Sequence, residues 1–208
     1  MQYVHGYSDS EAERLKDQAD TLAGLLHAEV RYPPGALVLE AGCGTGCQTL
    51  HLASNNPDTQ FVAVDISPQS LAQAEESVRL NPGLPPAALE WVPADVFDHL
   101  ASGERYGLIV ADPPPFARRR MEVEGALRGY LTLNQQALRC LSPGGILFTF
   151  SCSGAVDRAV FRQVLEEAAL RSGRKVRMLA ELHADADHPV AAGHPEGEYL
   201  KGWMLHAD

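Results

Sequence analysis

Glu40-Ala41-Gly42-Cys43-Gly44-Thr45-Gly46 is the stretch that decides the fold. A near-continuous apolar run over 36–40 leads into it, which is typical of a buried parallel strand, and a short helical segment through Leu52 follows it. Glycines at alternate positions let the backbone turn tightly and let a ligand approach the main chain, and the N-terminus of the next helix offers free amide groups. We therefore expect a strand, a cofactor-binding loop and a helix.

Strands and helices alternate along the rest of the chain. Apolar runs predict further strands over 61–65, 89–92, 108–111, 146–150, 175–182 and 198–206. Apolar residues at helical spacing predict helices over 8–30, 68–80, 123–141 and 156–171. This alternation predicts an α/β fold with a mostly parallel sheet covered on both faces, whose ligands bind beyond the carboxyl ends of the strands. Without an internal repeat or linker, we expect residues 1–208 to form a single domain, with 1–30 as a helix leading into the sheet.

Composition limits the classes of function. The 208 residues are 45% hydrophobic and 21% charged, as in a globular protein, and no apolar run is long enough for a membrane span. The N-terminus does not resemble a signal peptide, so we expect a cytoplasmic protein whose four cysteines are reduced. A net charge of −10 opposes binding that depends on phosphate neutralisation, so a nucleic-acid partner requires local evidence.

Two more acids follow predicted strands. Asp65 ends the second strand, where a carboxylate can accept both hydroxyls of a ribose. Asp95 follows the third strand and is placed to accept the exocyclic amine of an adenine, although an exposed loop aspartate is an equally simple interpretation.

The acid-x-Gly-x-Gly-x-Gly pattern at 40–46 resembles the first motif of class I S-adenosylmethionine-dependent methyltransferases. This resemblance implies a Rossmann-like seven-stranded sheet with an antiparallel last strand, and S-adenosyl-L-methionine as cofactor. A nicotinamide cofactor is disfavoured because Gly46 falls one residue early for the dehydrogenase pattern. The cofactor residues that the resemblance implies are Glu40, Gly42, Gly44, Gly46, Asp65, Ile66, Asp95, Val96 and Asp112.

Two loops in the second half carry further chemistry. Asp112-Pro113-Pro114-Pro115-Phe116 follows the fourth strand, and its prolines hold the carboxylate rigidly. Cys152 follows the fifth strand and precedes a helix, where a helix N-terminus lowers a thiol pKa and favours a nucleophile. A buried, inert cysteine is the alternative.

Five blocks in the second half resemble the bacterial large-subunit ribosomal RNA (cytosine-5) methyltransferases, and residues 1–88 resemble small-molecule methyltransferases. The blocks are Asp112-Pro113-Pro114, Arg128-Gly129-Tyr130, Thr149 to Gly154, Asp187 to Val190 and Pro195 to Gly202. The resemblance implies that Cys152 adds to C6 of cytosine and that C5 then takes the methyl group. It also implies that Asp112 holds the N3 and N4 edge of the base. One departure is Pro115, which stands where that family has lysine.

A basic and aromatic patch follows the Asp-Pro-Pro loop and suggests an RNA partner, although an arginine run can also be solvated surface. The predicted substrate-binding residues are Pro113, Pro114, Phe116, Arg118, Arg119, Arg120, Arg128 and Tyr130. Two alternatives stay open: a methyltransferase for a small-molecule acceptor without a covalent intermediate, and a non-catalytic cofactor-binding module. We expect no metal, because the spacing of Cys43, Cys47 and His51 is not that of a zinc site.

Overall fold

The computed structural model describes residues 31–80, 89–117, 119–184, 190–193, 197 and 199–208. The chain forms two compact units, Met1–His99 and Leu100–Asp208. The helix predicted over 8–30 lies outside the described residues.

The first unit is built on parallel strands. Its elements are β1 (Leu37–Ala41), α2 (Cys47–Asn55), β2 (Gln60–Asp65), α3 (Pro68–Leu80) and β3 (Leu89–Pro93), and α4 (Val96–Ala101) follows at its end. β2 pairs in parallel with β1 on one side and with β3 on the other. These elements agree with the alternation predicted from the sequence, except that α4 was not predicted, because six residues are too few to show a helical period.

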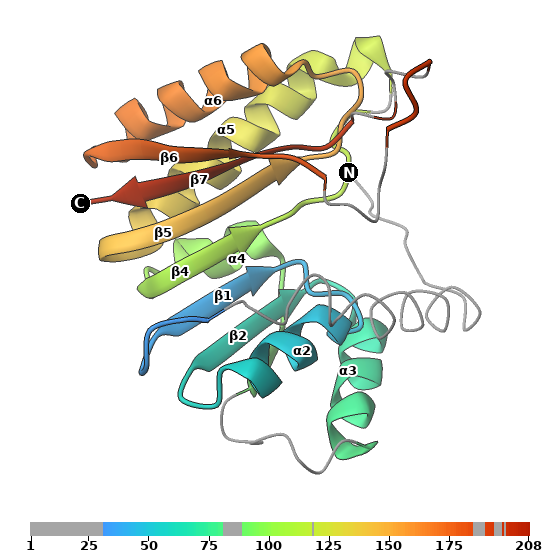
Figure 1. The fold of residues 1–208 in the computed structure, drawn as a ribbon, viewed down its shortest axis with the longest axis vertical. Coiled ribbons are helices and arrows are strands. Elements are labelled where there is room, and N and C mark those ends of the chain that lie inside the picture. The colour runs from blue at the N-terminus through green and yellow to red at the C-terminus, as the bar shows by residue number, and fades with distance from the viewer. Residues whose placement is uncertain (1–30, 81–88, 118, 185–189, 194–196, 198) are drawn as a thin grey trace. The chain divides into compact units, whose positions relative to one another are not determined.

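The second unit contains β4 (Tyr106–Ala111), the 3-10 turn η2 (Arg120–Glu122), α5 (Val123–Cys140), β5 (Leu141–Ser151), α6 (Arg158–Ser172), β6 (Val176–Leu182) and β7 (Lys201–Ala207). β5 is parallel to β4, and β7 lies antiparallel between β5 and β6. Figure 1 shows α5 and α6 side by side along these strands.

The strand order of the seven-stranded sheet is β3-β2-β1-β4-β5-β7-β6. With its antiparallel last strand, this order confirms the predicted Rossmann-like α/β fold class.

Several element boundaries differ from the prediction. β4 starts at Tyr106 and not at Leu108, and β7 starts at Lys201 and not at position 198. β5 starts at Leu141, not at Ile146, because Leu141 already pairs with Tyr106 before an irregularity in the register. The Ser142-Pro143-Gly144-Gly145 sequence predicts a turn by composition, and only this pairing brings it into the strand. Helix α6 starts at Arg158 after the extended residue Asp157, two residues later than predicted.

Aromatic side chains connect the helices of the second unit to β7. The Tyr130 and Phe161 rings have centroids 5.1 Å apart, and Phe161 and Trp203 have centroids 5.5 Å apart. All three rings are at most 3% exposed. They form the packed base beneath the loops that follow β4 and β5.

Candidate active site

The glycine loop after β1 has the backbone conformation that its sequence predicts. Gly42, Gly44 and Gly46 have φ angles of 88°, 56° and 70°, in the left-handed region that side chains disfavour. At Gly46 there is a second constraint, because a Cβ atom there would lie 2.5 Å from the Trp91 ring and 2.9 Å from Cβ of Ala74. This loop therefore needs glycine for its conformation, and at Gly46 also for close packing.

The loop uses its own amides to attach itself to β2. The amides of Gly42 and Cys43 donate to the Val64 carbonyl at 2.8 and 3.1 Å, and the Gly44 amide donates to Asp65 Oδ2 at 2.9 Å. The amides that remain available to a ligand are therefore those of the first turn of α2, because the N-cap residue, Gly46, has no side chain that could accept from them.

Asp65 is held in a fixed orientation at the end of β2. Its Oδ2 accepts from Gly44 and its Oδ1 accepts from the Ser67 amide at 2.8 Å. Ile66 beside it is 52% exposed, which is unusual for a large aliphatic side chain next to a carboxylate. A carboxylate with an adjacent apolar surface suits a ribose and an aromatic base.

Asp95 begins α4, and its Oδ1 accepts from the Phe97 amide at 2.8 Å. This is the bond of a helix cap, so the aspartate has a structural role whether or not it binds adenine. Val96, next to it, is partly exposed.

Glu40 is a buried carboxylate, 9% exposed, that accepts from the Thr49 hydroxyl. Burial, and then the charges of Glu40 and Asp65, raise the pKa of the Cys43 thiol far above its usual range. Cys43 packs with Ala63 and Leu71, so it is an inert core cysteine.

In the second unit, two hydrogen bonds join the loop after β4 to the loop after β5. The Cys152 thiol donates to the Pro113 carbonyl at 3.5 Å, and the Ala117 amide donates to Ser153 Oγ at 3.1 Å. The structure thus brings together the Asp112-Pro113-Pro114 loop and Cys152, which the sequence singled out separately.

The predicted role of Tyr130 at the surface is wrong for this structure. Its ring is 0% exposed and packs against Phe116 with centroids 4.6 Å apart, and its hydroxyl lies 2.9 Å from Ser153 Oγ. A fully covered ring cannot stack on a base. Tyr130 instead supports Ser153, because its helix packs on the sheet with this face inward.

The expected activation of Cys152 by a helix N-terminus is also wrong. Helix α6 begins six residues later, at Arg158, and burial followed by the charge of Asp112 raises the pKa of the Cys152 thiol to about 11. The thiol is therefore protonated at neutral pH.

The charged form of Asp112 is disfavoured as well. Solvent reaches its side chain, yet the surrounding protein removes enough water for desolvation to raise the pKa of the carboxyl to about 6. Such a carboxyl exchanges its proton near neutral pH, which suits a group that both donates and accepts.

Comparison with known proteins identifies the class. Residues 39–112 match the model of a methyltransferase domain. Ribosomal RNA large subunit methyltransferase I of Photobacterium profundum is 39% identical over 183 residues, which cover 86% of this chain and 46% of that protein. The protein of the same name in Serratia proteamaculans is 43% identical over 176 residues, covering 83% of this chain and 44% of that protein. The chain carries a class I S-adenosylmethionine-dependent methyltransferase domain.

Solved structures support the fold of this methyltransferase domain. The protein SMU.776, crystallised with SAH, has a TM-score of 0.72 at 21% identity, and the match covers 91% of this chain and 48% of that chain. A TehB-like protein of Corynebacterium glutamicum has a TM-score of 0.63 at 18% identity, and the match covers 96% of this chain and 97% of that chain. The chain spans about half the length of the curated relatives that it matches.

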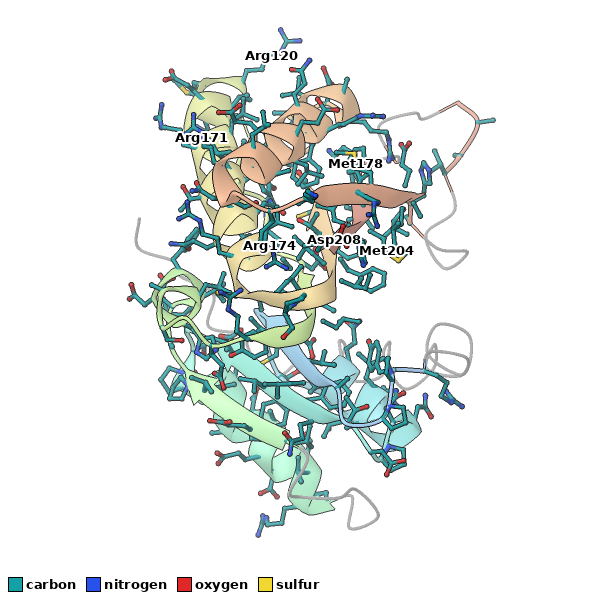
Figure 2. The ribbon with its side chains drawn as sticks, turned by 90° about the vertical axis from the view of Figure 1, so that its left-hand side faces the viewer. Arg120, Arg171, Arg174, Met178, Met204 and Asp208 are labelled. Carbon is teal, nitrogen blue, oxygen red and sulfur yellow. The ribbon has the colours of Figure 1, made fainter. Side chains whose placement is uncertain are left out.

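The remaining predicted substrate residues of the methyltransferase domain differ in accessibility. Arg119 and Arg120 are exposed, and Figure 2 shows Arg120 extending away from the ribbon. Arg128 is exposed and pairs with Glu124 at 2.6 Å. Pro113 is buried, Pro114 and Phe116 are partly buried, and Arg118 lies outside the described residues.

Sequence reasoning missed Ser153 and Lys201. Ser153 is fully buried and bonds to the loop after β4 and to α5, and its carbonyl accepts from Lys201 Nζ at 2.7 Å. Both residues lie within blocks that were quoted for the family resemblance, and a lysine at the start of a mostly apolar strand was the signal available in the sequence.

Among the described residues, no group of three or more His, Cys, Asp or Glu side chains could hold a metal ion. Within the same part of the chain, no helix is long and apolar enough to cross a membrane.

Proposed function

We propose that this methyltransferase transfers a methyl group to C5 of a cytosine in ribosomal RNA through a covalent adduct with Cys152. The observation that carries the proposal is the bond from the Cys152 thiol to the Pro113 carbonyl, which holds a nucleophile beside the Asp112 loop. The relatives named ribosomal RNA large subunit methyltransferase I support RNA as the partner. We include in the proposal that both units act as one catalytic domain and that the protein works in the cytoplasm.

For the cofactor, we propose binding at the glycine loop and the acids of the first unit. Asp65 is held by two backbone amides and keeps lone pairs for a ribose diol. Ile66, Val96 and Asp95 supply an apolar surface and a carboxylate for the adenine, and Glu40 with Gly42 lies on the methionine side. S-adenosylmethionine, when bound, supplies an electrophilic methyl group.

Cys152 and Asp112 act on different atoms of the cytosine base. The Cys152 sulfur forms a bond to C6, and the electron pair of the C5–C6 double bond moves so that C5 becomes nucleophilic. Asp112, with its pKa near 6, can accept from the N4 amine and donate a proton to N3, where negative charge develops. After methylation water takes the proton from C5, the electron pair re-forms the C5–C6 double bond, and the C6–sulfur bond breaks to release the Cys152 thiolate. The proton on N3 returns to Asp112, which restores the aromatic base, and the thiolate takes up a proton from solvent.

For RNA binding, we propose that Arg118, Arg119, Arg120 and Arg128 contact phosphates beside the Asp-Pro-Pro loop. Arg119 and Arg120 are exposed, and the exposed pair of Arg128 with Glu124 costs little to break. Local positive charge would then offset a net charge of −10.

Trapping with a 5-fluorocytosine oligonucleotide from ribosomal RNA tests the covalent step, because fluorine at C5 cannot leave as a proton does. The parent protein should gain the mass of the oligonucleotide plus a methyl group, and Cys152→Ala should gain nothing while still binding S-adenosylmethionine. Cys140→Ala is the matched control, because this buried thiol donates only to the Leu100 carbonyl and has no contact with the Asp112 loop among the described residues. Methyl transfer by Cys152→Ala at the parent rate would refute the covalent mechanism.

A methyltransferase for a small acceptor is the second candidate, and the acidic net charge favours it. In that case the protein methylates a small molecule, no adduct is trapped, and Cys152→Ala keeps its activity. A cofactor-binding module would bind S-adenosylhomocysteine and transfer no methyl group to either class of acceptor.

A further inference from the structure

Lys201 is a buried cation beside the turn that carries Cys152. It is the first residue of β7 and pairs directly with Ser151 of β5, the residue before Cys152. The residue is 4% exposed, and its Nζ donates to the Ser153 carbonyl at 2.7 Å. An ammonium group at this depth is costly unless the protein uses its hydrogen bonds and its charge.

The hydrogen bond to Ser153 fixes the backbone on one side of Cys152. Ser153 is also held through its hydroxyl by the Ala117 amide and Tyr130. A neutral donor would satisfy the carbonyl equally well, so the bond alone does not explain why a lysine stands here.

The charges around Cys152 give a reason for a charged donor at position 201. Burial and then the charge of Asp112, from the loop after β4, raise the pKa of the Cys152 thiol, whereas the charge of Lys201, from β7, lowers it. Tyr130 faces Cys152 from α5 with a neutral hydroxyl, because burial raises its pKa. Burial lowers the pKa of Lys201, and an ionised Cys152 is the neighbour that raises it most. At the start of α6, Arg158 lowers this pKa and Asp157 raises it.

We propose that Lys201 is a positioning residue for the nucleophile: its hydrogen bond fixes the Cys152-Ser153 turn, and its positive charge stabilises the Cys152 thiolate against the opposing charge of Asp112. The role rests on the proposed function of Cys152. When a cytosine base hydrogen-bonds to Asp112, the negative charge of Asp112 is compensated. The positive charge of Lys201 is then unopposed, and the Cys152 sulfur gives up its proton to solvent and becomes a thiolate.

Alkylation of the whole chain by iodoacetamide at pH 8 separates charge from hydrogen bonding, because only the thiolate reacts. Lys201→Gln keeps a donor for Ser153 and removes the charge, and we expect it to slow Cys152 alkylation about tenfold, the effect of one pKa unit from a neighbouring opposite charge. Lys201→Arg keeps the charge and should stay within about threefold of the parent. Cys47 in the same sample is the internal control, and fragment-ion mass spectrometry distinguishes Cys152 from Cys140.

Equal rates for Cys152 in the parent and in Lys201→Gln, or equal slowing by Gln and Arg, would overturn the electrostatic role. If the alkylation pattern holds but the parent traps no fluorinated RNA, then the proposed function fails while the role of Lys201 toward the thiolate stands.

A second measurement leaves Lys201 in place and decides the question even if Lys201→Gln does not fold. The chain has only three lysines, Lys16, Lys175 and Lys201, so ¹³C-lysine NMR can follow each ammonium group through a pH titration. Cys152→Asp places a carboxylate that stays ionised through the titration where the thiolate would form, so it should raise the pKa of Lys201 by about half a unit or more relative to Cys152→Ala and leave Lys175 unchanged. An unchanged Lys201 titration would refute the coupling.

Discussion

Replacing Gly46 by alanine tests the architecture of the cofactor loop. The φ angle of 70° costs a side-chain-bearing residue about 1–2 kcal/mol. The new Cβ would also lie 2.5 Å from the Trp91 ring and 2.9 Å from Ala74 Cβ. Trp91 packs on the cluster of Cys43, Ala63 and Leu71 and cannot move away freely, so overpacking adds about 1–3 kcal/mol. We expect Gly46→Ala to lower the free energy of unfolding by about 2–5 kcal/mol.

Gly35→Ala is the matched control, because Gly35 has a φ of 75° and a Cβ added there would meet no atom within 4 Å. It should show the backbone cost alone, about 1–2 kcal/mol. Urea unfolding of both variants gives the difference, and calorimetry with S-adenosylhomocysteine should show weaker binding only for Gly46→Ala. Equal unfolding free energies for the two variants would refute the argument that close packing against Trp91 requires glycine at 46.

Three further outcomes are expected. Asp65→Ala should weaken S-adenosylhomocysteine binding by about 1.5–3 kcal/mol, the range for hydrogen bonds to a charged group, and unchanged affinity in calorimetry would exclude Asp65 from the ribose site. Because desolvation raises the pKa of Asp112 to about 6, from a usual value near 4, the folded protein binds the proton more tightly than the unfolded chain does. The free energy of unfolding should therefore fall as pH rises from about 4 to 6, and chemical denaturation should show this fall reduced in Asp112→Asn. Arg174 donates to five backbone carbonyls, including that of Asp208 (Figure 2), so Arg174→Ala should destabilise the fold by about 3 kcal/mol. Arg171→Ala is the control, because it loses one exposed ion pair with Glu167 and should cost under about 0.5 kcal/mol. Thermal unfolding measures both variants.

The elements and the glycine loop of the first unit could be predicted because their signals are local. Gly42, Gly44 and Gly46 need a left-handed backbone where a strand turns into a helix, and a sequence shows this by residue type alone. Asp65 follows from its position at the end of an apolar strand. The strands were found for the same reason, since each buried parallel strand is a short apolar run.

The side-chain environment in the second unit could not be predicted to the same depth because it comes from contacts between distant segments. The spacing that marks Tyr130 as one face of a helix does not show that this face is covered by Phe116 and Phe161. Likewise, whether a helix N-terminus activates Cys152 depends on where α6 starts, and Asp157 delays that start. The long-range bond of Lys201 to Ser153 joins positions 48 residues apart, so no local pattern contains it.

The protonated resting state of Cys152 has a consequence for how the proposed reaction is controlled. With its pKa raised to about 11, the thiol is protonated at pH 7 in the free protein, and a protonated thiol is a poor target for oxidation and non-specific alkylation. The barrier that this creates must be lowered after substrate binds. Burial is the larger cause of the raised pKa of Cys152, and the charge of Asp112 is the second cause and the one that a bound base can remove, because the pKa of Asp112 is itself raised to about 6. A base that hydrogen-bonds to Asp112 therefore removes the opposing charge in the same step that presents C6 to the sulfur, and the thiolate forms where an acceptor is already in place.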